Sequence, residues 1–393
     1  MTFARRIRVR LRRQLDVSAH ALVALAVASS TAGCGNAADK GGSVAVQISG
    51  EAAATEGFSF PKGSDVTFAD GWELHFSHVL VTVGDVTLSE NPDKAPADQA
   101  QTGAAVAREA GPWAVDLAVQ GGVPAAGGQG TATPLTTIAR ENLDGDKPFA
   151  ADRRYAFGYR LVPAETRAAR VNFAADAAAE ALYARMISEG FTVLYAGTAT
   201  FAGKDCVTSD PAYDVSALPT ALPFELGFRT PTSYVNCQNQ ENQGTAFEGE
   251  EYQRGIALLP NQPALAQITL HLEHPFFSDT VHDSTIYFDQ LAARFDGAAL
   301  TTDDLVGLDP TAFTDVHGAA LPWRVCPSDA APELPLGRQR SFGVGHTLVD
   351  PVGNPRDAFR DYRDFVAYVQ SAQAHLNGGE GLCYVARDYP SPP

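Results

Sequence analysis

The sequence predicts a mainly β protein, an antiparallel β-sandwich or barrel-like sheet with a few peripheral α-helices. Apolar and polar residues alternate in many short segments, which is the period of a strand with one buried face. The connections draw on 35 glycines and 25 prolines, residues that favour turns. Helical spacing of apolar residues is confined to three segments. Many short strands joined by Gly/Pro-rich turns are typical of sandwiches and barrels.

The alternating segments begin after residue 42 and continue almost to the end of the chain. Gly84-Asp85 is a candidate turn within one of them, so that segment is either one long strand or a hairpin. Two stretches rich in Ala, Gly, Pro and Gln, 92–103 and 120–134, are predicted to be long surface loops or mobile linkers. The predicted strands are 43–48, 72–88, 113–119, 155–161, 191–201, 224–229, 255–259, 267–273 and 382–386.

Three helices are expected to interrupt the strands. The first covers 173–189, with Asn172 as its N-cap and Gly190 after its last turn. The second has apolar residues at i, i+3, i+4 and i+7 over 288–295 and ends at Gly297. The third follows Pro355 and keeps apolar spacings of three and four as far as Leu376. His375 would then lie in its last turn, where a cation complements the helix dipole.

The N-terminus has the features of a bacterial export signal. Six arginines precede an apolar run at 21–28, and Ala32-Gly33-Cys34 matches the end of a lipobox. The run is too short to span about 30 Å of hydrocarbon, so we expect it to be cleaved. The predicted organisation is a signal peptide at 1–33, a tether at 34–42 that begins with lipidated Cys34, and a β-rich globular region at 43–390. The alternative is cleavage nearby that leaves Cys34 free.

Lipid on Cys34 would anchor the mature chain to a membrane of the cell envelope. Gly35-Asn36 lacks the aspartate that retains lipoproteins in the inner membrane, which favours the outer membrane. Cleavage removes six arginines and one aspartate, so the formal charge changes from −17 to −22. Such an acidic surface repels phosphate backbones, which excludes nucleic acid as a partner.

Four of the five cysteines lie beyond Cys34, all after residue 200. In an oxidising compartment they are expected to form disulfides. No two have CxxC spacing, which argues against a zinc ribbon or a thioredoxin-type centre. Their order along the chain favours Cys206–Cys237 and Cys326–Cys383 among the three connectivities. Their concentration in the later half also allows two subdomains that divide near residue 200.

The segment 269–283 holds the best candidate for a metal site. Alternation on a strand places His271 and Glu273 on one face and two leucines on the other. Pro275 cannot donate to a sheet and should end the strand, which would let His274 and His282 turn toward the same point. His and Glu ligands suit a transition metal such as copper or zinc once the cysteines are paired. The alternative is a solvated face of an amphipathic strand.

The other histidines are weaker candidates. His75 shares a strand face with Glu73 and is a candidate fifth ligand, whereas His78 is in phase with buried residues and is expected to be a hydrogen-bonded core histidine. His317 and His346 lie in predicted loops, from which either could complete a distant site.

Two segments resemble those of uncharacterised lipoproteins from myxobacteria and their relatives. They are Asp70-Gly71-Trp72-Glu73-Leu74-His75-Phe76, running into 80–83, and 228–237, followed by the histidine-rich segment. This resemblance implies an exported lipoprotein without a particular activity. The export signal, cysteines and scattered histidines are also similar to periplasmic copper-binding partners of di-haem peroxidase-like proteins, which implies copper binding by histidines and an oxidised tryptophan. Here Trp72 and His75 would face opposite sides of a strand, which departs from that arrangement.

The sequence therefore predicts a lipid-anchored envelope protein that binds a transition metal. The alternative is a structural lipoprotein that binds a non-metal ligand or another protein, for which exposed aromatic residues such as Phe276, Phe277 and Trp323 around a groove would be evidence. An enzyme is less favoured, because G-x-S-x-G, Walker, Rossmann and H-E-x-x-H motifs are absent. A metallohydrolase would additionally need an open coordination position and a placed base.

Overall fold

The computed structural model describes residues 41–387 except for 61–65, 151–152, 174, 244–251, 279–284, 310–312, 328–347, 350–354, 357–360, 372–373 and 379–380. The predicted signal peptide, Cys34, His282 and His346 lie outside these residues. From Lys40 onward the chain forms one compact unit. Strands from before and after residue 200 share both of its large sheets.

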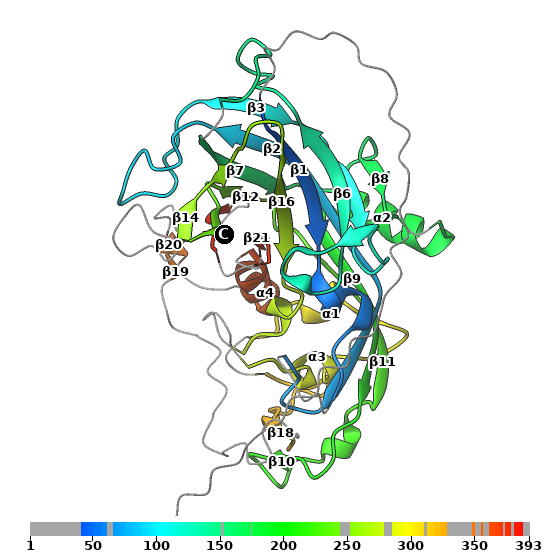
Figure 1. Ribbon diagram of the computed structural model, residues 1–393. Helices are drawn as coiled ribbons and strands as arrows, with labels where there is room; N and C mark the ends of the chain where they lie inside the picture. Colours follow the sequence, from blue (N-terminus) through cyan, green and yellow to red (C-terminus); the bar gives the residue numbers. More distant parts are fainter. Residues whose placement is uncertain are drawn as a thin grey trace, which may run out of the picture. The chain divides into compact units, whose positions relative to one another are not determined.

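The fold is mainly β, with sandwich-like sheets, as the alternating segments predict (Figure 1). The larger sheet has 11 strands. Its strands are β2 (Trp72–Ser89), β3 (Ala105–Glu109), β4 (Trp113–Asp116), β7 (Arg154–Leu161), β8 (Ala169–Val171), β9 (Val193–Phe201), β11 (Ala221–Phe228), β12 (Thr232–Val235), β15 (Ile256–Ala257), β17 (Leu300–Thr301) and β22 (Tyr384–Arg387).

The smaller sheet has five strands in the order β21-β16-β1-β6-β5. They are β1 (Ser43–Ser49), β5 (Val123–Pro124), β6 (Thr131–Ile138), β16 (Pro263–Leu270) and β21 (Ala374–Leu376). Three further pairs of strands are β10 (Val207–Thr208) with β18 (Arg324–Val325), β13 (Gln238–Gln243) with β14 (Tyr252–Arg254), and β19 (Leu348–Val349) with β20 (Pro355–Arg356).

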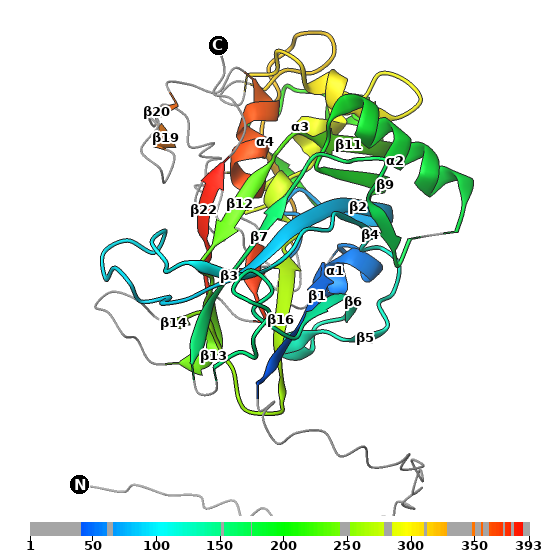
Figure 2. The ribbon, with the colours of Figure 1, turned by 90° about the horizontal axis from the view of Figure 1, so that it is seen from above.

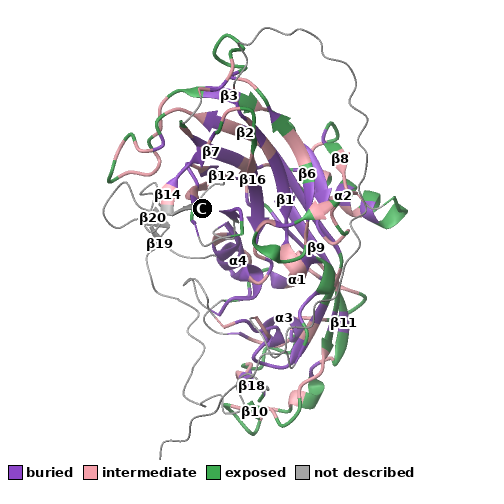
Figure 3. Cartoon of the chain, viewed as in Figure 1, coloured by how far each residue is buried: buried purple, intermediate pink, exposed green. Residues whose placement is uncertain are grey.

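The main core lies on one face of each large sheet. Val44, Val46 and Ile48 of β1 alternate into it, and so do Ile268 and Leu270 of β16. Figure 3 shows these central strands as largely buried. The opposite face of the smaller sheet is polar although it is also buried, since Gln47 donates to Gln267 at 2.8 Å and Gln267 donates to Thr269 at 2.8 Å.

The sheets are not purely antiparallel. β1 pairs with β16 in parallel, with Ser49 opposite Thr269, although these two residues are 220 positions apart in the sequence. β4 with β8 and β11 with β17 are also parallel. Strand periodicity is the same in both orientations, so the alternation that predicts the strands does not predict which neighbours they take.

The segment with Gly84-Asp85 is one continuous strand, β2, and not a hairpin. Asp85 has a φ of 51°, and the pairing with β7 shifts register between Gly84 and Thr87. Gly84-Asp85, the pair that suggests a turn, therefore forms a β-bulge. The bulge bends the strand without reversing its direction.

The helices are shorter than their sequence patterns. They are α1 (Glu51–Glu56), α2 (Ala177–Glu189), α3 (Asp289–Ala292) and α4 (Tyr362–Ser371), with 3-10 turns η1 (Ala126–Gly128), η2 (Val215–Ala217), η3 (His274–Phe276) and η4 (Thr302–Leu305). Asp176, and not Asn172, caps α2 by accepting from the amide of Ala179 at 2.7 Å. Gly190 ends α2 in the left-handed conformation, as predicted. Among the described residues, no helix has the length and apolarity to cross a bilayer.

α2 packs on the face of the larger sheet that points away from the main core (Figure 2). Leu80 and Leu194 contribute to its cluster, whereas the adjacent Val79 and Val193 belong to the main core. The two faces of β2 and β9 are therefore both buried. This explains why these strands contain apolar runs beside their alternation.

The four cysteines form two disulfides, as expected, but the pairing inferred from their order is wrong. The bonds are Cys206–Cys326 and Cys237–Cys383. β10 pairs with β18, which puts Cys206 next to Cys326, and β12 pairs with β22, which brings the other two together. Strand pairing between distant segments decides the connectivity, and proximity along the chain does not.

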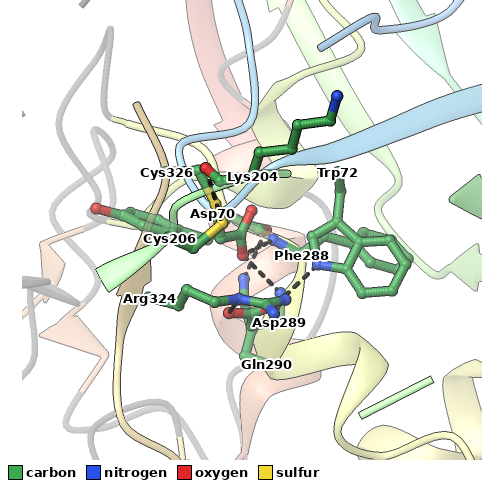
Figure 4. Close-up of polar contacts among 10 residues, drawn as sticks. Asp70, Trp72, Lys204, Cys206, Phe288, Asp289, Gln290, Arg324 and Cys326 are labelled. Atoms are coloured by element: carbon green, nitrogen blue, oxygen red, sulfur yellow. Dashed lines mark hydrogen bonds and ion pairs between the residues drawn. A yellow bond between two sulfur atoms is a disulfide. The ribbon is translucent and has the colours of Figure 1, made fainter. Parts of the chain in front are cut away.

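A buried polar cluster lies beside the first disulfide (Figure 4). Asp70 accepts from the amides of Phe288 and Asp289 at 2.8 and 2.7 Å. Asp289 in turn accepts from Trp72 Nε1 at 2.8 Å and from Arg324 Nε at 3.0 Å. The charges of this cluster are hydrogen-bonded within the protein, which fixes the start of α3 against β2.

The segment 92–103, predicted to be a long surface loop or a mobile linker, is held by side chains from elsewhere in the chain. Asn236 donates to the carbonyls of Pro92 and Gln99 at 2.8 and 2.9 Å. The buried Arg254 donates to the carbonyls of Ala95 and Pro96 at 2.8 and 3.2 Å. An irregular segment of polar composition is thus fixed by hydrogen bonds to its backbone.

Candidate metal centre

The candidate centre lies where β16 ends. The strand stops at Leu270, earlier than predicted, but the alternation continues for three residues. Leu272 is buried in the core, whereas His271 and Glu273 are half-buried on the opposite side. Pro275 then lies in the 3-10 turn η3, which brings His274 back toward them. Pro275, predicted to end the strand, instead lies in the turn that follows, five residues after the strand has ended.

His271, Glu273 and His274 converge. Each offers one donor atom, and these atoms all lie within 4.8 Å of one another. His271 Nδ1 and Glu273 Oε1 are 3.1 Å apart. The rings of His271 and His274 meet edge to face, with centroids 5.8 Å apart.

A hydrogen bond from α4 fixes the orientation of His274. This side chain is 1% exposed, and its Nδ1 is 2.9 Å from the carbonyl oxygen of Val369. A carbonyl only accepts, so Nδ1 carries a proton, and in the neutral form of the ring Nε2 is the atom with the lone pair. Metal-ligating histidines are commonly oriented in this way by a hydrogen bond from their other nitrogen.

The electrostatics keep Glu273 ionised. Burial alone would raise its pKa, but the hydrogen bond and charge of His271, together with the charge of His274, lower the pKa to about 2. Glu51, the first residue of α1, feels the same groups: burial and Glu273 raise its pKa, and His271 opposes them. The carboxylate of Glu273 is thus in the form that binds a cation at neutral pH.

Not every predicted ligand belongs to this group. His75 is exposed on β2 opposite Thr198, and the group does not contain it. His282 lies outside the described residues, as does His346. His317 is exposed in a turn closed by Asp315.

His78 is a buried core histidine, as its position in the pattern indicates. Its Nδ1 is 2.7 Å from Asp116 Oδ2, and Asp116 is fully buried. The structure thus gives His78 a partner inside the core, away from the candidate centre.

The residue that the sequence interpretation missed is His375. The predicted helix ends early, at Ser371, and His375 lies in strand β21, where its ring stacks on that of His271 with centroids 4.5 Å apart. The prediction of a helical last turn is wrong because the apolar spacing continues into the strand. Asn377 and Gly378 mark the end of that strand and not of a helix.

Comparisons of the chain with protein-family models, with curated proteins and with solved structures found no match. The chemistry of the centre is therefore read from its own residues. Two imidazoles and one carboxylate are a set of ligands that zinc and other late first-row transition metals accept.

Proposed function

We propose that this protein is an exported, lipid-anchored protein of the cell envelope that binds a transition metal ion, zinc or copper, through His271, Glu273 and His274. The observation that carries the proposal is the convergence of these three side chains within 4.8 Å. The hydrogen bond from His274 to Val369 supports it, because it orients the ring and leaves Nε2 as the nitrogen that can coordinate a metal.

Two further observations support the envelope location. The sequence 1–34 has the charge, apolar run and cysteine of a lipoprotein signal. Four cysteines form two disulfides, which persist in oxidising compartments.

The alternative of a groove lined by aromatic residues has less support. Phe276 and Phe277 are 0% and 4% exposed, so they belong to the core and do not line an open groove. Trp323 packs against a small buried cluster that includes Tyr287. We therefore assign the binding role to the metal centre.

Calorimetric titration of the metal-free protein with Zn²⁺ and Cu²⁺ tests the proposal. The wild-type protein should bind one ion, and a His271→Ala/His274→Ala variant should lose that binding event. His75→Ala is the matched control, because it removes an exposed histidine that lies outside the group and should leave the affinity unchanged. Equal binding by the double variant and the wild type would contradict the proposal.

A further inference from the structure

We propose that His375 is a fourth protein ligand of this centre, so that three imidazoles and one carboxylate hold the metal. This inference rests on the proposed function and extends it to a residue in a different segment of the chain. It assigns a role to β21, the edge strand of the smaller sheet.

The register of the sheet puts His375 on the correct face. β21 runs antiparallel to β16, with His375 opposite Thr269. Residues directly opposite in a sheet point to the same side, and residues two apart on one strand do so as well. Thr269, His271 and His375 therefore share a face, the polar face of the smaller sheet, while Leu376 points into the main core.

The rings of His271 and His375 are in contact, but His375 does not belong to the group whose donor atoms all lie within 4.8 Å of one another. The imidazoles of His271 and His375 are stacked, with centroids 4.5 Å apart and an interplanar angle of 17°. Two nitrogen ligands of a tetrahedral zinc ion lie about 3.3 Å apart, from zinc–nitrogen bonds of about 2.0–2.1 Å. Shared coordination therefore requires the side chain of His375 to rotate out of its stack with His271, so that one of its nitrogens turns toward the group.

The backbone that carries His375 is already fixed. The amide of Asn377 donates to the carbonyl of Gln267 at 2.7 Å, and the side chain of Asn377 accepts from the amide of Gln267 at 2.9 Å. A further bridge joins His375 to Leu382, one residue before the Cys237–Cys383 disulfide. Because the strand is ordered before the ion arrives, binding has to reorient only the side chain of His375 and not its backbone.

The chemistry of these four ligands also indicates which metal ions the centre would bind. Three imidazoles with one carboxylate suit the borderline divalent ions, zinc and copper among them, whereas Ca²⁺ and Mg²⁺ prefer six or more oxygen ligands. Glu51 provides a second carboxylate nearby. It begins α1 two residues after Ser49, just as His271 follows Thr269 by two residues on the parallel neighbour β16.

X-ray absorption of the full, zinc-loaded wild-type protein tests the inference without any substitution. The multiple-scattering signal of imidazole counts the histidine ligands. We expect three, and a count of two would overturn the inference.

A variant provides an independent measurement of the same point. His375→Phe keeps a ring against His271 but removes both nitrogens, so we expect zinc affinity to fall on the order of 100-fold. His75→Phe is the matched control and should keep the wild-type affinity. Unchanged affinity in His375→Phe would show that the ring only packs against His271, which overturns the inference.

These outcomes separate the inference from the proposed function. Zinc bound through two imidazoles, with His375→Phe unaffected, would refute the fourth ligand and leave the proposed function standing. A wild-type protein that binds neither zinc nor copper would refute both. If His375→Phe fails to fold, as judged by circular dichroism, the ligand count on the wild-type protein decides.

Discussion

The buried polar residues of this protein are held by hydrogen bonds to groups from other parts of the chain. Asp116 is fully buried and accepts from the amides of Val79 and Ala118 at 3.0 and 3.1 Å, besides its contact with His78. Sequence alternation identifies His78 as a core residue, but it gives no sign of its partner 38 residues away. Periodicity reports which face a residue occupies, and it does not report the groups that come from other strands.

Removal of Asp116 should be costly. Asp116→Ala leaves two amides and an imidazole nitrogen buried without their acceptor, so we expect a loss of about 3 kcal/mol in the free energy of unfolding. Urea denaturation measures this difference. Asp296→Ala, at an exposed position, should change stability by less than about 0.5 kcal/mol. Equal effects of the two substitutions would show that the buried contacts contribute little.

Asp361 should make stability depend on acid pH. Burial would raise its pKa, but hydrogen bonds from Arg363 and from the amide of Gly307 outweigh burial and lower the pKa below its ordinary value of 3.8. A lowered pKa in the folded state stabilises the protein above the pKa of the unfolded chain, and this stabilisation is lost as pH falls through the folded pKa.

The comparison of wild type with Asp361→Asn in urea at a series of pH values measures this effect. The stability advantage of the wild type should be complete near neutral pH and should shrink as pH falls below about 4. An advantage that is constant across this range would contradict the assignment.

At the scale of elements, alternation predicts most strands, but their partners and some ends are set by contacts that are distant in sequence. β6 lies within a stretch predicted in part to be loop, although four of its residues are threonines, which favour strands. The end of α4 is missed for the opposite reason, because the apolar spacing continues through β21. The local pattern is ambiguous there, and pairing with β16 decides it.

In the candidate centre, too, the local sequence pattern predicts some of the residues, and contacts between distant segments decide the rest. Residues close in sequence, His271, Glu273 and His274, could be predicted together because strand alternation and Pro275 act locally. His375 could not, since it depends on the register between β21 and β16. His75 has the right residue type but lies on a strand of the other sheet.

Metal binding should therefore order specific elements. His274 is joined to α4 through Val369, and His375 lies in β21, so we expect zinc to slow amide exchange in both elements. Hydrogen exchange with and without zinc, followed by mass spectrometry, measures this. α2 is the internal control, since it packs on the far face of the larger sheet and should not change. Protection that is absent from β21 would contradict the proposed link between the ion and this strand.

At the scale of the whole molecule, the disulfides join segments 120 and 146 residues apart. Both bonds lie wholly after residue 200, whereas the large sheets draw strands from both halves of the chain. The position of the cysteines in the sequence suggests two subdomains that divide near residue 200. Both large sheets, however, extend across this point.

Lipid attachment is the prediction that concerns the whole molecule. In a bacterial host, the wild-type protein should incorporate labelled palmitate and partition into the detergent phase, because two or more acyl chains give stable membrane binding. Cys34→Ala should do neither and keeps the four cysteines of the disulfides. Wild-type protein with a free thiol at Cys34 and no label would contradict the lipid anchor.

Element analysis by plasma mass spectrometry, on protein purified without a histidine tag, tests the central claim most directly. We predict close to one transition metal ion per chain, and a loss of this ion in the His271→Ala/His274→Ala variant. Wild-type protein that is purified without metal, and that still takes up no zinc or copper after incubation with either ion, would contradict the account.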